Sequence, residues 1–363
     1  MNKKKSTPAD HGGRFVAIIT SLNKRLTLRR LKGGFAFSRL SWSDFGPAPK
    51  AASFLLFCTL FFFSCTGFEK SVPIDTNNPY PNMVTLTFGD SYIYEFKSFD
   101  ISSTRLIIDF TGSGWGSALG LYTDNEWRFT GTGAQLIQVL RSDHTIIIPE
   151  KWNRVPGINY IDDMEARFLY TIENLVESYV STINSYIANN NYSSIFLVGT
   201  SEGAALLPLI YENMSQKYLV KGMVSIAAGG LSQYESYLIS MEKDNVPEFW
   251  INAYSFSIGI QENIEHYYQS LETTPFGLVH RQMASFLNHR PFDHFVNIDI
   301  PILFIHGVND MNIAVESTEY IEMNLPDKPF EYIYYEEMGH IPMNDPERKV
   351  FRDDVARWIR GIN

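Results

Sequence analysis

The stretch that most constrains the fold of this chain runs from Ser194 to Leu207. It opens with an apolar run rich in β-branched and aromatic residues, passes through Gly199-Thr200-Ser201-Glu202-Gly203, and continues with small and aliphatic residues. The pattern predicts a buried strand, a tight turn and a helix, with Ser201 at the apex. A turn this sharp strains the serine backbone and crowds it, so glycine is needed at both ends. The alternative is a glycine-rich turn with an ordinary exposed serine.

Charge is unevenly distributed along the chain. Of its 30 Lys and Arg and 40 Asp and Glu, residues 1–50 hold eleven and two, which leaves 19 basic and 38 acidic residues and a formal charge of −19 for the remainder. A chain segment this acidic repels the phosphate backbone of nucleic acids, so we expect no nucleic-acid partner. Apolar residues make up 45% and charged residues 19% of the 363 residues, which is typical of a globular protein.

Residues 1–65 are predicted to be a basic leader followed by a hydrophobic signal or anchor segment. No charged residue lies between Ala51 and Phe68, and the apolar centre of this segment is about 14 residues long. That length is short for a membrane span and normal for the core of a signal peptide. The segment ends in Ser64-Cys65, which resembles a relaxed lipoprotein signal that is cut before a lipid-modified Cys65.

The linker at 66–82 is rich in Pro and Asn and has no periodicity, as expected of a spacer before a globular domain at 83–363. We therefore expect an exported protein that is tethered to a membrane through lipid on Cys65. The alternatives are an uncleaved inner-membrane anchor, a cleaved secretory signal and a buried core segment, and mass spectrometry of the mature N-terminus distinguishes them. Because the leader is long for a signal peptide, we expect a translation start downstream of Met1. The sequence leaves the oligomeric state open.

Beyond residue 83, short β-type runs alternate with helical patterns. Strands are predicted at 83–88 and 91–96 (as a hairpin), 105–110, 145–149, 194–199, 222–228, 301–307 and 330–335, and helices at 164–187, after 201, from 314 and from 345. This alternation predicts an α/β fold with a mostly parallel sheet and helices on both faces. Residues 229–297 lack buried β runs and are aromatic and helical, so we interpret them as a cap inserted over one end of the sheet.

Three candidate catalytic residues follow three of the predicted strands. Ser201 comes after the strand at 194–199, Asp310 comes just after the strand at 301–307, and His340 comes after the strand at 330–335. Functional groups in open α/β sheets gather at the carboxyl ends of strands, so we expect the three to meet. A serine hydroxyl becomes a good nucleophile when a neutral imidazole takes its proton and a carboxylate orients that imidazole.

Each assignment has an alternative. Asp310 is otherwise a surface-turn aspartate and His340 an ordinary loop histidine. Glu337 is a second candidate for the acid, but it adjoins the histidine instead of preceding it by one strand. His306 lies inside an apolar strand and is interpreted as a core histidine.

An oxyanion-binding site needs two backbone N–H groups. One is expected from Glu202, the residue after the candidate nucleophile, and the other from Ser113 in the loop after the strand at 105–110. Gly112 and Gly114 are the alternates for the second donor. The carboxylate of Glu202 suits the start of a helix, yet it disfavours a nearby oxyanion unless its side chain points away.

Taken together, GTSEG at 199–203, HGVND at 306–310 and GH at 339–340 resemble the α/β-hydrolase superfamily, and the chain is similar to capped serine esterases from about Met83 to its end. The resemblance implies a serine hydrolase that cleaves an ester of a small or medium acyl group through an acyl-enzyme, without cofactor or metal. TGSG at 111–114 replaces the more usual His-Gly. The same triad also serves thioesterases, lipases, aminopeptidases and acyltransferases. The other alternative is a non-catalytic binding protein with the same fold.

The cap is expected to choose the substrate. Its aromatic residues at 250–295 suggest an apolar pocket for an acyl group. Five basic side chains in the same region either bind a substrate carboxylate or form a solvated face: His280, Arg281, His289, Arg290 and His294.

Overall fold

The structure is a computed structural model. It describes residues 3–4, 83–88, 91–113, 118–121, 127–129, 132–151, 168–243, 246–273, 278–342 and 345–362. The predicted hydrophobic segment, Cys65, the linker at 66–82 and Gly114 lie outside these ranges, so the lipid anchor and the export of the protein stay predictions. Within the described ranges, none of the helices combines the length and apolar character needed to cross a membrane.

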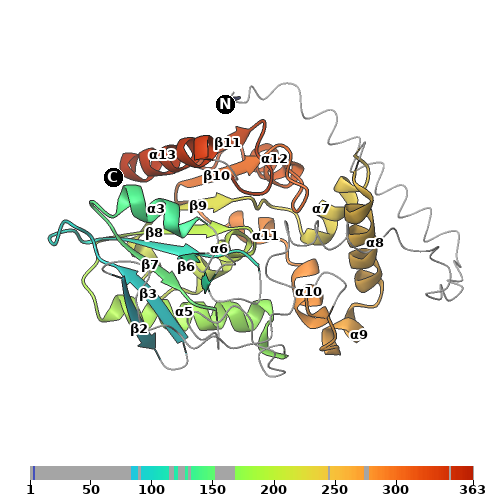
Figure 1. Cartoon of the computed structure of the whole chain (residues 1–363), viewed down its shortest axis with the longest axis horizontal. Helices are drawn as coiled ribbons and strands as arrows, with labels where there is room; N and C mark the ends of the chain where they lie inside the picture. The colour runs from blue at the N-terminus through green and yellow to red at the C-terminus, as the bar shows by residue number, and fades with distance from the viewer. Residues whose placement is uncertain are drawn as a thin grey trace, which may run out of the picture. The chain divides into compact units, whose positions relative to one another are not determined.

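A nine-stranded, mostly parallel sheet forms the centre of the fold (Figure 1). Its strands lie in the order β1-β11-β10-β9-β8-β4-β7-β3-β2. In chain order they are β1 (Lys3–Lys4), β2 (Met83–Phe88), β3 (Ser91–Phe96), β4 (Arg105–Phe110), β7 (Thr145–Pro149), β8 (Ser194–Thr200), β9 (Val220–Ile226), β10 (Ile302–Gly307) and β11 (Phe330–Tyr335). All pairs from β11 across to β7 are parallel, so the loops after β7, β4, β8, β9, β10 and β11 emerge at the same edge.

The antiparallel strands lie at the two sides of the sheet. The predicted hairpin is confirmed, because β2 pairs with β3 from Met83 opposite Phe96 to Phe88 opposite Ser91. At the other side, β1 pairs antiparallel with β11. A separate two-stranded sheet joins β5 (Leu119–Leu121) to β6 (Trp127–Phe129). Neither β1 nor this small sheet is predicted, because strands of two or three residues carry no readable alternation.

Helices cover both faces of the sheet. Figure 1 shows α3 (Gly133–Leu140) and α13 (Asp345–Gly361) on one face, and α5 (Ile172–Ala188) and α6 (Glu202–Asn213) on the other. Apolar side chains of the strands, such as Phe196 and Val198, share one buried cluster with Phe351, Val355 and Trp358 of α13. The predicted fold class is confirmed.

One predicted helix begins later than expected. The apolar spacing from 164 to 187 predicts a single helix, but α5 starts at Ile172, where the Thr171 hydroxyl accepts a hydrogen bond from the Asn174 N–H (3.5 Å). Phe168 is 48% exposed, so it does not belong to the buried stripe of α5. A helix-like spacing of apolar residues does not reveal a capping residue that interrupts it.

The region between β9 and β10 is helical and has a small core of its own. It contains α7 (Gln233–Ser240), α8 (Glu248–Glu262), α9 (Ile264–Gln269), α10 (His280–Leu287) and α11 (Phe292–Phe295). Tyr237, Tyr254, Met283 and Leu287 belong to this cluster of buried side chains. The Tyr254 hydroxyl donates a hydrogen bond to the Met311 carbonyl in the loop after β10, which connects the cap to the sheet edge. That loop leads into α12 (Glu316–Asn324).

A buried carboxyl group lies near the carboxyl end of β4. Asp109 of β4 is fully buried, its Oδ2 has no hydrogen-bond partner among the described residues, and its Oδ1 lies 3.4 Å from the Thr132 hydroxyl. Burial raises the pKa of Asp109 from 3.8 to about 7. The folded protein therefore binds a proton that the unfolded chain has already lost, and the stability contributed by this group falls as pH rises from about 4 to about 7.

Asp109→Asn removes this pH dependence. We expect the melting temperature of the variant, relative to wild type, to rise by several degrees between pH 4.5 and pH 8, because each unit of pKa shift is worth about 1.4 kcal/mol. Differential scanning calorimetry at several pH values measures the difference. Asp100→Asn, at a fully exposed carboxylate, is the control and should show no such trend. A difference for Asp109→Asn that stays constant with pH would contradict the assignment.

Candidate active site

Ser201 lies in the turn between β8 and α6 with a strained backbone. Its φ of 54° and ψ of −117° belong to a region that residues with a side chain rarely adopt. The Ser201 N–H donates a hydrogen bond to the Ile226 carbonyl at the end of β9 (2.8 Å), and the Ser201 carbonyl accepts one from the Ala205 N–H (2.9 Å). These bonds hold the serine where strand and helix meet, as the sequence pattern predicts.

Both flanking glycines are required by close backbone packing. A Cβ on Gly199 would lie 2.7 Å from the Ala204 nitrogen, inside α6. A Cβ on Gly203 would lie 2.6 Å from the Thr111 carbonyl oxygen and closer still to that of Phe110. These distances are shorter than a carbon atom tolerates, so α6 packs directly against β8 and against the end of β4.

Asp310 and His340 are brought together by the loops after β10 and β11. His340 Nδ1 lies 2.8 Å from Asp310 Oδ2, and a carboxylate accepts, so Nδ1 carries the proton. The two loops are joined by the Asn309 N–H, which donates to the Met338 carbonyl (3.1 Å), and by the Asn309 side chain, which donates to the Glu336 carbonyl (2.9 Å). This geometry favours Asp310 over the exposed Glu337 as the partner of His340.

Asp310 is buried and remains ionised. Its Oδ1 accepts hydrogen bonds from the backbone N–H groups of Asn312 (2.7 Å) and Ile313 (3.0 Å). Burial alone would raise its pKa, but His340 and His306 hold the pKa of this carboxyl well below its usual range. A carboxylate orients and stabilises an imidazole that accepts a proton.

His306 is a core histidine, as predicted, but it also supports the acid. It is fully buried, and its Nε2 lies 3.2 Å from Asp310 Oδ2 and 3.0 Å from the Ile313 carbonyl. Its Nδ1 lies 2.7 Å from the Thr318 hydroxyl of α12. The contact with Asp310 is a role that sequence reasoning missed. The only signal is the spacing of four residues between this histidine and the candidate acid.

Ser201 is not bonded to His340. Across the part of the chain that the structure describes, no hydrogen bond joins the Ser201 hydroxyl to the His340 ring. Catalytic hydrogen bonds are often long in a free enzyme and shorten when substrate binds. The structure therefore brings His340 and Asp310 into contact, and the Ser201–His340–Asp310 triad itself stays a prediction.

The loop after β4 lies against the serine. A Cβ on Gly112 would lie 3.3 Å from Ser201 Cβ and 3.9 Å from Ser201 Oγ, so Gly112 itself approaches the candidate nucleophile closely. Ser113 lines the same cavity as Ser201 and Glu202. Gly114 lies outside the described residues. Both predicted donors of the oxyanion site, Ser113 and Glu202, therefore border one cavity with the serine.

The carboxylate of Glu202 is bound by neighbouring side chains. Its Oε1 accepts from Lys151 Nζ (3.0 Å) and from the Tyr170 hydroxyl (2.6 Å), and its Oε2 lies 3.4 Å from Gln282 Nε2 of the cap. The Lys151 side chain is 2% exposed and that of Glu202 is 7% exposed. Lys151 therefore compensates the charge that the sequence places next to the candidate oxyanion site. Sequence reasoning missed Lys151, although Glu150-Lys151 is a charged pair directly after a buried strand.

A small cavity of about 80 Å³ opens at Ser201 between the sheet edge and the cap. Its floor comes from the turn of Ser201 and from the end of β9, and its roof comes largely from α10. The lining residues from the cap and its flanks are Leu231, Gln233, Leu278, Gln282, Met283, Phe286, His289 and Pro291. The lining is mostly apolar with a few polar groups, which is typical of a site for a small organic molecule.

Of the five basic residues predicted to act together in the cap, four do not line the cavity, although the rings of His289 and His294 lie 5.9 Å apart. Only His289 lines the cavity; its Nε2 lies 2.9 Å from the Ala205 carbonyl, and burial lowers its pKa. The other four contact partners elsewhere: Ser270 for His280, the rings of Phe168 and Tyr268 for Arg281, Glu235 for Arg290, and Glu212 for His294. These contacts form neither a carboxylate-binding cluster in the cavity nor a single solvated face, because the side chains from α10, from the segment before α11 and from α11 contact different neighbours.

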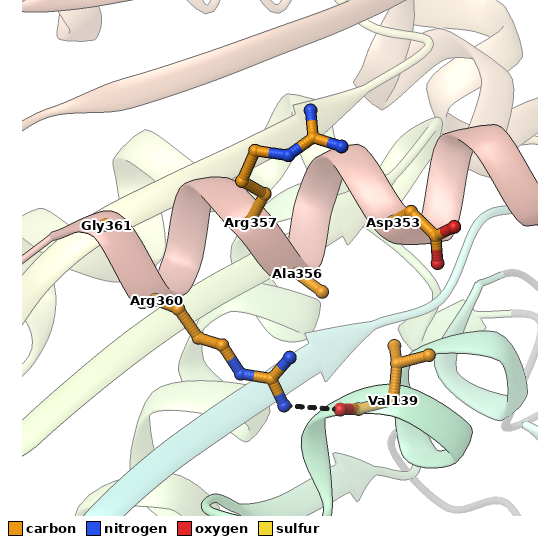
Figure 2. Close-up of a pocket in the computed structure, with 6 residues that line it drawn as sticks. All are labelled: Val139, Asp353, Ala356, Arg357, Arg360 and Gly361. Carbon is orange, nitrogen blue, oxygen red and sulfur yellow. Dashed lines mark hydrogen bonds between the residues drawn. The ribbon is translucent and has the colours of Figure 1, made fainter.

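A second depression lies between α3 and α13 (Figure 2). Its lining includes Arg360, whose guanidinium donates to the Val139 carbonyl (2.6 Å) and pairs with Asp143 (2.9 Å). Asp353 is the single carboxylate among its six lining residues, and none of the six is a serine, a cysteine or a histidine. In the described ranges, no group of three His, Cys, Asp or Glu side chains is arranged to hold a metal ion.

Comparison with known proteins supports the fold. No protein-family model matches the sequence. A segment of 73 residues is 30% identical to YtmA, an uncharacterized peptidase of Bacillus subtilis (strain 168), and covers 20% of this chain and 28% of that protein.

Two solved structures are similar over most of the described domain. Acylaminoacyl peptidase of Pyrococcus horikoshii has a TM-score of 0.52 at 12% identity, with 77% of this chain and 41% of that chain covered. Est1E of Butyrivibrio proteoclasticus, with ferulic acid bound, has a TM-score of 0.51 at 12% identity, with 77% and 98% covered. The chain thus has the α/β-hydrolase fold, and it spans less than half the length of the two peptidases.

Gly203→Ala tests the packing that forms the turn. We expect the substitution to lower the free energy of unfolding by about 1–3 kcal/mol, the usual cost of forcing extra atoms into a packed site. The matched control is Gly259→Ala in α8, where a Cβ meets nothing within 4 Å. That change should raise stability by about 0.5–1 kcal/mol because alanine favours a helix. Urea unfolding measures both, and a fully stable Gly203→Ala protein would contradict the packing argument.

Proposed function

We propose that the protein is a serine hydrolase that cleaves carboxylic esters through an acyl-enzyme. In this proposal Ser201 is the nucleophile, His340 the general base and acid, and Asp310 the carboxylate that orients His340. The observation that carries the proposal is the 2.8 Å contact between His340 Nδ1 and Asp310 Oδ2. It forms at the ends of two strands on the sheet edge that also carries the strained Ser201.

The reaction proceeds in two halves. Ser201 Oγ attacks the carbonyl carbon of the ester while His340 Nε2 takes the hydroxyl proton, and the carbonyl oxygen becomes an oxyanion. Collapse of this tetrahedral species breaks the ester bond, and His340 returns the proton to the leaving alcohol. Water then attacks the acyl-enzyme with His340 again as base. The second collapse releases the carboxylic acid and restores the Ser201 hydroxyl.

Two features of the site support the oxyanion step. The N-terminus of α6 directs free backbone N–H groups and the positive end of the helix dipole toward the turn of Ser201. The Glu202 carboxylate would oppose this field, but it is paired with Lys151 at 3.0 Å. We assign the backbone N–H groups of Glu202 and Ser113 as the two donors to the oxyanion.

The cavity favours a short acyl group. The cavity that borders Ser201 is small, with a volume of about 80 Å³, and this supports an acetyl or propionyl chain as the acyl group in preference to a fatty acyl chain. Phe286 of α10 lines this cavity and is half-buried. We therefore propose small-molecule esters of short carboxylic acids as substrates.

A peptidase is the second candidate. Its support is the resemblance to acylaminoacyl peptidase, which extends over 77% of this chain, and the short matching segment of YtmA. The same three residues cleave amides by the same steps, since His340 would protonate a leaving amine in place of an alcohol. Aminoacyl amides therefore belong in the substrate panel.

Removal of the nucleophile or the base should abolish turnover. We expect Ser201→Ala and His340→Ala each to lower kcat for p-nitrophenyl acetate by at least about 10³-fold. Ser201 forms the bond to the acyl group, and His340 takes and returns a proton in both half-reactions. Ser185→Ala and His266→Ala, at exposed positions of α5 and α9, are matched controls that should retain wild-type rates. Wild-type activity in either site variant would refute the triad.

A panel of p-nitrophenyl esters tests the acyl cavity. We expect kcat/KM to be highest for acetyl to butyryl esters and to fall for longer chains. Phe286→Ala enlarges the cavity and should shift this optimum toward longer acyl groups by a few carbons. Phe99→Ala, at a side chain that is 69% exposed, is the control. A panel without chain-length preference would exclude this cavity as the acyl site, and faster cleavage of aminoacyl amides would favour the peptidase.

A further inference from the structure

A buried lysine joins the loops that follow three adjacent strands. Lys151 lies two residues after the end of β7 and is 2% exposed. Its Nζ donates to the Gly112 carbonyl after β4 (2.5 Å) and to Glu202 Oε1 after β8 (3.0 Å), and it lies 2.9 Å from the Tyr170 hydroxyl. Since β7, β4 and β8 are neighbours in the sheet, a single ammonium group contacts both loops proposed to bind the oxyanion.

Glu150, the residue before Lys151, binds a second part of the loop between β4 and β5. The Glu150 carboxylate is 1% exposed and accepts a hydrogen bond from the Ala118 N–H at 2.9 Å. The Tyr94 hydroxyl donates to its Oε2 at 2.9 Å. Two consecutive residues at the end of β7 therefore bind Gly112 and Ala118. Neither contact is needed to form a strand or a helix.

The contact with Gly112 has a directional consequence. The Gly112 carbonyl and the Ser113 N–H belong to one planar peptide group, and in a trans peptide they point in opposite directions. A lysine that holds the carbonyl oxygen therefore also fixes the direction of the Ser113 N–H. Gly112 in turn approaches Ser201, since a Cβ at this position would lie 3.3 Å from Ser201 Cβ.

We propose that Lys151 is a positioning residue of the oxyanion site, which aims the Ser113 N–H at the developing oxyanion and holds the Glu202 carboxylate away from it. The inference rests on the proposed hydrolase function and deepens it. The competing explanation is that Lys151 serves only as the counter-ion of Glu202. The two differ in one respect: a counter-ion is dispensable once Glu202 is neutral, whereas the hold on Gly112 is not.

Three variants separate these roles: Lys151→Met, the double variant Lys151→Met with Glu202→Gln, and Lys243→Met. The last removes a lysine that pairs with Glu316 at 2.8 Å outside the cavity and is the matched control. The readouts are kcat and KM for p-nitrophenyl acetate and the Ki of a trifluoromethyl ketone. This inhibitor forms a tetrahedral adduct with the serine and so reports on oxyanion binding.

We expect Lys151→Met and the double variant to lower kcat about 10- to 100-fold with KM changed less than about threefold, since a misdirected donor costs somewhat less than an absent one. The Ki should rise by a factor similar to the loss in kcat. Lys243→Met should behave as wild type. This split between kcat and KM, matched by Ki, is not produced by a general loss of packing.

Several outcomes would overturn the inference. Wild-type kcat in Lys151→Met does so directly, and recovery of wild-type kcat in the double variant reduces Lys151 to a counter-ion. If neither variant folds, Tyr170→Phe takes their place, because its hydroxyl contacts both Lys151 and Glu202. It should lower kcat about 3- to 10-fold with a parallel rise in Ki, and unchanged values would refute the proposal. A wild-type protein inactive on every ester, thioester and amide instead refutes the hydrolase function, and this inference with it.

Discussion

The close approach of Gly203 to the end of β4 is the constraint on which the rest of the site depends. With no Cβ between them, the first turn of α6 packs directly on the carbonyl groups of Phe110 and Thr111. This contact places the start of α6 beside the loop that begins at Gly112. Ser201, two residues before Gly203, has the strained φ of 54°. The strained turn and the loop proposed to bind the oxyanion therefore lie on either side of one close backbone contact.

Buried charge is organised in two clusters beside this turn. On one side, Asp310 lies between His340 and His306 at 2.8 and 3.2 Å. On the other side, Lys151 and Glu202 form an ion pair at 3.0 Å. Buried charges are tolerated only when they are paired and hydrogen-bonded. Removing one partner from either cluster would therefore leave an uncompensated buried charge and destabilise the fold. In the proposed mechanism, the first cluster prepares His340 to take the serine proton, and the second keeps the Glu202 charge from opposing the field of α6 near the oxyanion.

The sequence predicted the parts that strong local patterns encode. The strand, turn and helix around Ser201, the parallel sheet and the pairing of Asp310 with His340 follow from apolar runs that end at chemically distinctive residues. Lys151 escaped prediction because its role depends on which strands are neighbours in the sheet, and strand order is not written in any local window. The late start of α5 escaped because apolar spacing continues through the exposed Phe168. The partners of the cap's basic residues are likewise set by tertiary packing.

Labelling with a fluorophosphonate tests most directly whether Ser201 is an activated nucleophile, as we propose. This reagent phosphonylates a serine only when a base and an oxyanion site act on it, so reactivity reports the assembled site rather than the presence of a hydroxyl. Peptide mass spectrometry should find one adduct, on Ser201, in the folded protein, and none after unfolding in urea or in His340→Ala. Absence of an adduct from the folded wild type, or an adduct on a different serine, would contradict the account.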